Sequence, residues 1–179
     1  PNSLHGGLVG FDKVFWKFID EKSNNQSLYF EYFSKDMEEG FPGNLVVGVE
    51  YILNDSNELK IKYKASTDKK TIVNLTQHSY FNLSGESSGD ILDHILNIDA
   101  EYYLPVNENM IPHGPYEKVE STPFDFNIPK KIGLDIFADD IQLEIGNGYD
   151  HCFVLGNQNG KLKKIGSVES LKTGIKMDI

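Results

Sequence analysis

The sequence contains little cysteine, little positive charge and no long apolar run, and each shortage excludes a class of protein. Cys152 is the only cysteine in 179 residues, so no internal disulfide can form. Lysine and arginine number 17 against 27 aspartates and glutamates, which gives a formal net charge of −10. No basic block can neutralise phosphates, and no stretch is apolar over the length of a membrane span. We therefore expect no nucleic-acid partner, no membrane partner and a reducing, cytoplasmic setting.

The apolar residues follow the period of β-strands. Residues 58–65 alternate polar and apolar side chains, and the turn residues 54–57 separate them from the apolar run 45–53, which together predict a hairpin. Residues 132–138 are the only stretch that favours a helix, and residues 101–129 are typical of a covering loop with buried aromatics. Further strands are predicted at residues 14–18, 27–33, 70–76, 92–99, 151–155, 161–169 and 174–179.

These patterns predict an all-β fold of large, mainly antiparallel sheets packed face to face. At this length we expect one domain over residues 1–179.

Three stretches combine chemistry-bearing side chains with turns or apolar runs. Residues 74–83 place His78 among hydroxyls and aromatics, where an imidazole could exchange protons near neutral pH. Residues 2–7 add His5 followed by two glycines, and residues 146–153 add Asp150 after a glycine-rich turn. Two histidines and one aspartate form the candidate site.

Together these stretches resemble the galactose mutarotase (aldose 1-epimerase) family. The matching pieces are Asn-Ser-Leu-His-Gly-Gly at 2–7, Asn-Leu-Thr-Gln-His-Ser-Tyr-Phe-Asn-Leu at 74–83 and Gly-Tyr-Asp-His-Cys-Phe at 148–153. Residues 104–107 and 122–126 are similar to the family's covering loop. The resemblance implies a β-supersandwich with an open cleft for an aldohexose such as galactose or glucose.

The resemblance also implies an isomerase that interconverts the α and β anomers of its sugar without metal or organic cofactor. By position His78 resembles the general acid and His5 a second catalytic histidine that also binds the sugar. Asp150 resembles a carboxylate that holds sugar hydroxyls, and Ser79 and Tyr80 line the site.

Two family residues have no matching position in this sequence. The family's general base is a glutamate in a later strand, and an arginine that binds substrate precedes the first histidine motif. We therefore expect residues 1–179 to be a domain truncated at both termini, which could be inactive alone. The alternatives are a non-catalytic carbohydrate-binding module on the same fold and a hexose-6-phosphate epimerase, and the oligomeric state stays open.

Other chemistry-bearing residues have structural interpretations. Along a strand, His151 points away from the direction of Asp150, and His94 lies within an alternating run, so both are expected to pack or hydrogen-bond. Cys152 is expected to be a small buried residue without a catalytic partner. The histidine spacing fits no zinc pattern, so we expect no metal.

Overall fold

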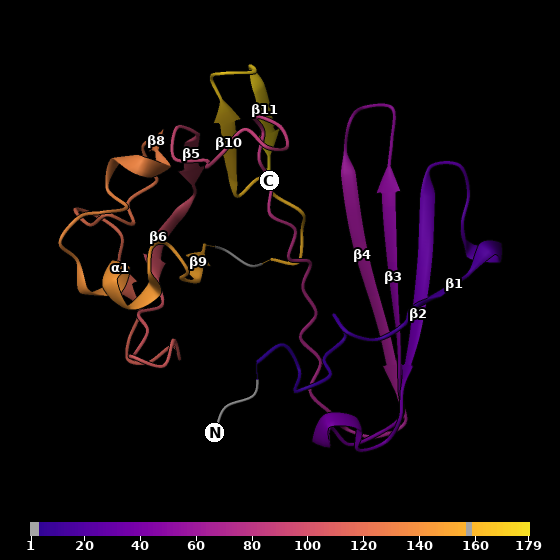
Figure 1. Cartoon of the computed structure of the whole chain (residues 1–179). Helices are drawn as coiled ribbons and strands as arrows, with labels where there is room; N and C mark the ends of the chain where they lie inside the picture. Colours follow the sequence, from indigo (N-terminus) through magenta and orange to yellow (C-terminus); the bar gives the residue numbers. More distant parts are fainter. Residues whose placement is uncertain (1–3, 157–158) are drawn as a thin grey trace. The chain divides into compact units, whose positions relative to one another are not determined.

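The computed structural model describes residues 4–156 and 159–179, and the chain forms two compact units, Pro1–Ser79 and Tyr80–Ile179. Each unit is described by itself (Figure 1). In the described part of the chain, no helix has the length and apolar character needed to cross a membrane. That residues 1–179 form one domain stays a prediction.

The first unit is built on one antiparallel sheet with strand order β1-β2-β3-β4. The long hairpin of β3 and β4 is the predicted one, and its register pairs Leu45 with Thr67 and Leu53 with Leu59. Asn54 closes the hairpin because its side-chain oxygen accepts hydrogen bonds from the backbone N–H groups of Ser56 and Glu58. The strands are β1 (Lys17–Phe18), β2 (Ser27–Ser34), β3 (Leu45–Leu53) and β4 (Leu59–Thr67), and the 3₁₀ turns are η1 (Asp20–Lys22) and η2 (Glu38–Gly40).

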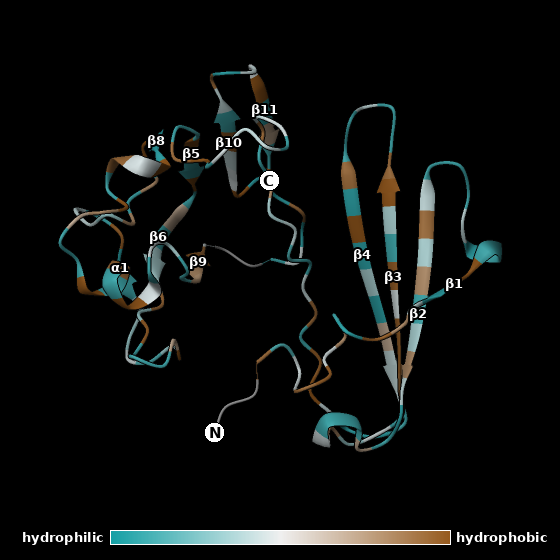
Figure 2. Ribbon diagram, viewed as in Figure 1, coloured by the Kyte–Doolittle hydropathy of each residue, from teal (hydrophilic) through white to brown (hydrophobic). Residues whose placement is uncertain are grey.

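Period-two patterning agrees with the burial along β3. Leu45, Val47 and Val49 of β3 are buried, as expected for alternate residues on one face of a strand. Figure 2 shows hydrophilic and hydrophobic residues alternating along β4. The predicted hairpin is therefore confirmed by its full-length pairing, although Leu59 and Tyr63 of β4 are exposed.

The second unit contains two smaller antiparallel sheets, with strand orders β11-β10-β5-β8 and β7-β6-β9. Its core packs Tyr103, Val119, Phe124 and Leu143 together. The strands are β5 (Ile95–Ile98), β6 (Ala100–Tyr103), β7 (Glu117–Lys118), β8 (Lys130–Lys131), β9 (Phe153–Leu155), β10 (Gly166–Ser170) and β11 (Ile175–Asp178), with η3 at Ile132–Leu134 and α1 at Ile141–Gly146.

Three predictions of local structure are wrong. Residues 70–76 form no strand, because β-branched residues favour extended backbone but a strand also needs a hydrogen-bonded neighbour. The helix lies at Ile141–Gly146 rather than at 132–138, because the side chain of Asp140 caps it by accepting from the N–H groups of Gln142 and Leu143. Residues 101–129 are only partly a loop, since they contain β7 and most of β6.

Cys152 is exposed, which contradicts the expectation of a buried thiol. Its neighbours His151 and Phe153 both contact the ring of Phe124, with centroids 4.7 and 6.5 Å away. Side chains alternate along extended backbone, so the residue between them faces outward. The all-β antiparallel class is confirmed, because strands dominate both units and helical segments are short.

Candidate functional site

His5 lies in a tight turn whose backbone is left-handed. Its φ is +54°, followed by +86° at Gly6 and +125° at Gly7, and the N–H of Gly7 donates to the carbonyl of Leu4 at 3.1 Å. Glycine adopts such angles without steric cost, which explains the paired glycines after the histidine. The turn leaves the His5 imidazole exposed at the wall of a cavity. Asn2 and Ser3 of this motif lie outside the described residues.

His78 lies in an extended segment without regular secondary structure that runs from residue 71 toward the end of the first unit. Thr71 to Thr76 and His78 itself line the same cavity as His5. The two imidazole rings meet edge to face, with centroids 6.2 Å apart and 69° between their planes. The structure thus brings together the two predicted catalytic residues from distant parts of the sequence.

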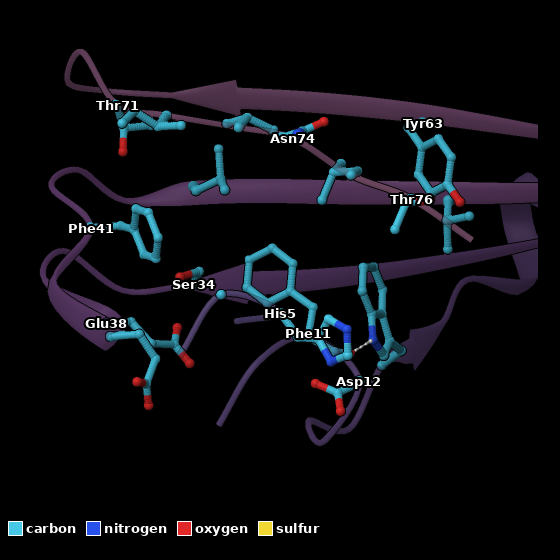
Figure 3. A pocket seen from close by; sticks show the side chains of 18 of the residues that line it. His5, Phe11, Asp12, Ser34, Glu38, Phe41, Tyr63, Thr71, Asn74 and Thr76 are labelled. Carbon is cyan, nitrogen blue, oxygen red and sulfur yellow. Dashed lines mark hydrogen bonds between the residues drawn. The ribbon is translucent and has the colours of Figure 1, made fainter. Parts of the chain in front are cut away.

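The cavity has a volume of about 900 Å³. Its walls are mainly apolar and aromatic, with a few polar side chains, which is the usual make-up of a small-molecule site. Figure 3 shows Thr71 and Asn74 on one side of the cavity and His5 and Asp12 on the opposite side. Hydroxyl, amide, imidazole and carboxylate groups therefore face a volume that could hold a small polar molecule.

Three acidic residues at this cavity were not predicted from the sequence: Asp12, Glu38 and Glu39. The hydroxyl of Tyr32 donates to Glu38 at 2.5 Å, and this hydrogen bond raises the pKa of Tyr32 to about 12. Both glutamates lie in η2, between β2 and β3, where no catalytic motif marks them. The nearest signal in the sequence is the group of turn residues Gly40, Pro42 and Gly43, which marks a loop but no catalytic role.

Aromatic packing holds the N-terminal segment against the sheet. The ring of Phe11 lies 6.1 Å from Trp16 and 5.4 Å from Tyr32, measured between centroids. The indole N–H of Trp16 also donates to the carbonyl of Phe11 at 2.9 Å. This cluster fixes the chain that follows the His5 turn, and Phe11 and Trp16 also form part of the cavity wall.

Ser79 and Tyr80 are both exposed, and the boundary between the two units falls between them. Neither lines the cavity described above. Their predicted contact with sugar therefore stays a prediction.

Asp150 belongs to the second unit, where its side chain is exposed. Tyr149 anchors the turn before it, because its hydroxyl donates to the carbonyl of Pro123 at 3.1 Å and its ring packs on Phe124 and Phe126. Burial raises the pKa of Tyr149 to about 12. The partly buried Tyr149 thus fixes the turn before Asp150, and the predicted contact of Asp150 with sugar stays a prediction.

His151 and His94 have the predicted structural roles. A ring nitrogen of His151 is 3.1 Å from Gln142 Oε1, and the ring packs edge-on against Tyr103 and Phe124. His94 is buried, and its Nε2 accepts a hydrogen bond from the N–H of Leu83 at 3.1 Å. Across residues 4–156 and 159–179, no three histidine, cysteine or acidic side chains gather as a metal site would require.

Comparison with known proteins places these features in a family. A family model described as Aldose 1-epimerase matches residues 1–179. The chain is 45% identical over 164 residues to the aldose 1-epimerase of Escherichia coli (strain K12), covering 92% of this chain and 46% of that protein. It is also 45% identical over 161 residues to the galactose mutarotase of Homo sapiens, covering 90% of this chain and 44% of that protein.

Solved structures agree with the sequence matches. A galactose 1-epimerase from Lactobacillus acidophilus superposes with a TM-score of 0.81 at 34% identity, over 93% of this chain and 48% of that one. An aldose epimerase homologue from C. elegans gives a TM-score of 0.83 at 27% identity, over 98% and 51%. The chain spans about half the length of the curated relatives that it matches. By its sequence and its fold, the chain belongs to the aldose 1-epimerase family.

Proposed function

We propose that the protein carrying this chain interconverts the α and β anomers of an aldohexose such as galactose or glucose. The observation that supports this most directly is the pair of imidazoles, His5 and His78, at one cavity wall in a chain of this family. Histidine is the side chain best suited to give and take a proton near neutral pH.

The reaction needs two proton transfers. His78 protonates the ring oxygen O5 of the pyranose while a base removes the proton from the hydroxyl on C1. The C1–O5 bond then breaks, its electron pair goes to O5, and C1 becomes an aldehyde. Rotation about C1–C2 and closure from the other face return both protons and deliver the other anomer. Each proton transfer by a positioned group contributes roughly 10²–10⁴-fold, and neither needs a cofactor.

The other residues have supporting roles in this proposal. His5 donates a hydrogen bond near O5, next to the acid, because its ring lies beside that of His78. Asp150, Ser79 and Tyr80 bind sugar hydroxyls. The base is a glutamate, as the resemblance to the family implies. We also infer a reducing, cytoplasmic setting, since Cys152 is the only cysteine in the sequence.

Polarimetry of freshly dissolved α-D-galactose and α-D-glucose tests the proposal. The protein should bring the optical rotation to its equilibrium value faster than buffer does, and His78→Asn should lower kcat by about 10²–10⁴-fold. His113→Asn is the matched control, because His113 is an exposed histidine of the second unit that does not line the cavity. A folded protein that binds galactose without accelerating its mutarotation would overturn the enzymatic function and favour a binding module.

A further inference from the structure

The loop between β2 and β3 reaches the His5 turn through one carboxylate, that of Glu39. Glu39 Oε2 accepts a hydrogen bond from the backbone N–H of Leu8 at 2.9 Å, and Oε1 accepts one from the N–H of Val9 at 3.1 Å. Two successive N–H groups are thus held by the two oxygens of one side chain. A carboxylate suits this arrangement because both its oxygens accept, whereas an amide offers only one acceptor oxygen.

The chain around this contact is shaped to admit the carboxylate. A Cβ at Gly7 would lie 2.1 Å from Glu39 Oε2, so any side chain at that position would displace the carboxylate. The φ of +125° at Gly7 disfavours other residues as well. The second glycine of the histidine motif therefore has a specific purpose here, which is to leave room for Glu39.

The loop that presents Glu39 is itself fixed in an uncommon conformation. Met37 and Glu39 both have positive φ, at +68° and +48°, and Gly40 follows at +86°. The N–H of Met37 donates to the carbonyl of Phe41 at 2.9 Å, and the N–H of Phe41 donates to the carbonyl of Glu38 at 3.0 Å. These bonds close a tight turn that holds Glu39 in place between two strands of the sheet.

A short loop of backbone connects Leu8 and Val9 to His5. A Cβ at Gly10 would lie 2.0 Å from the carbonyl oxygen of His5, so the backbone from His5 to Gly10 folds back onto itself. The N–H of Gly7 also donates to the carbonyl of Leu4. In this compact loop we expect a shift of Leu8 and Val9 to displace the His5 ring from its place beside His78.

We propose that Glu39 is a positioning residue that sets the His5 imidazole against His78, an inference that rests on the function proposed above. Glu39 acts through the backbone of residues 8 and 9 and not on the sugar. Misplacing a reacting group by about 1 Å can cost roughly a hundredfold in rate, so loss of this contact should be visible in turnover.

The test compares Glu39→Gln with Asp68→Asn, a closely matched control. Asp68 also binds two N–H donors with its two oxygens, the backbone and side-chain N–H groups of Asn44 at 2.8 and 2.7 Å, but it does not line the cavity. Glu39→Gln should lower kcat/KM for galactose mutarotation by about ten- to a hundredfold, and Asp68→Asn should leave it within about twofold. Equal losses in the two variants would overturn the proposal.

A double variant separates positioning from general loss of structure. If Glu39 acts through His5, then Glu39→Gln should cause no further loss in a His5→Asn background. Multiplicative losses in the double variant would show that Glu39 acts independently of His5 and would overturn the inference.

A readout without activity keeps this inference distinct from the proposed function. In Glu39→Gln, but not in Asp68→Asn, hydrogen exchange at the amides of Leu8 and Val9 should accelerate and the NMR signals of the His5 ring should shift. Glu39→Gln could show these effects while the unchanged protein catalyses no mutarotation. In that case the proposed function fails and the positioning contact stands. If exchange and ring signals match those of the unchanged protein, the positioning contact fails.

Discussion

The imidazole rings of His5 and His78 lie edge to face with their centroids 6.2 Å apart, although one comes from the start of the chain and the other from the end of the first unit. In the proposed function, both rings contact the same sugar. Because the rings lie together, single and double variants of His5 and His78 test whether the two residues act as a unit.

His5→Asn and His78→Asn should each lower kcat, and the double variant should be little worse than the more damaging single change. Residues that act together in one step lose activity non-additively, because removal of one leaves little for the other to contribute. Polarimetry on α-D-galactose measures all three variants, with His113→Asn as control. Losses that multiply would assign the two histidines to separate steps.

Phe124→Ala should lower the free energy of unfolding by about 3–5 kcal/mol. Phe124 is fully buried, and its ring stacks on Tyr103 with centroids 4.4 Å apart and 10° between planes. Phe137→Ala is the control, since Phe137 is 84% exposed and loss of its ring should cost under about 0.5 kcal/mol. Urea denaturation followed by circular dichroism measures both, and similar midpoints for the two variants would contradict the packing seen around Phe124.

Asp140→Ala should cost about 1 kcal/mol, because it removes the acceptor for the first N–H groups of α1. Asp139→Ala removes a neighbouring carboxylate that caps nothing in the described structure of α1, so its effect should stay within about 0.5 kcal/mol. Hydrogen exchange at Gln142 and Leu143 would locate the change. Unaltered exchange in Asp140→Ala would refute the capping role.

The protein should lose stability as the pH falls below about 6.5, in part through His151. Burial lowers the pKa of the His151 imidazole, although the nearby carboxylates of Asp150 and Asp140 oppose this. The unfolded chain then binds a proton at a higher pH than the folded one. The contribution is fully present above the unfolded pKa and declines as the pH falls through the window down to the lower folded pKa.

Urea midpoints measured between pH 8 and pH 5 check this prediction. His151→Gln cannot titrate, so its midpoint should fall less over this range than that of the unchanged protein. The same decline in both proteins would remove His151 as a cause.

The sequence determined what depends on near neighbours in the chain. Period-two alternation and the Asn54 turn specify the β3–β4 hairpin, because side-chain alternation and turn closure are local properties. The sequence also allowed recognition of the histidine motifs at 5 and 78 and of the Asp150 motif. Their residue types and order resemble a family, and this resemblance does not depend on their distances in space. These local signals were sufficient for the all-β class and for the family.

Tertiary structure decided what depends on distant partners. Residues 70–76 have the composition of a strand but form none, because a strand exists only where a neighbour supplies hydrogen bonds. Nothing in the sequence pairs Glu39 with the amides of Leu8 and Val9, since that contact depends on how the loop between β2 and β3 closes. Cys152 is likewise exposed because its two neighbours pack on Phe124. The residue types indicated which chemistry was possible. The geometry of the site depends on contacts between segments that are far apart in the sequence.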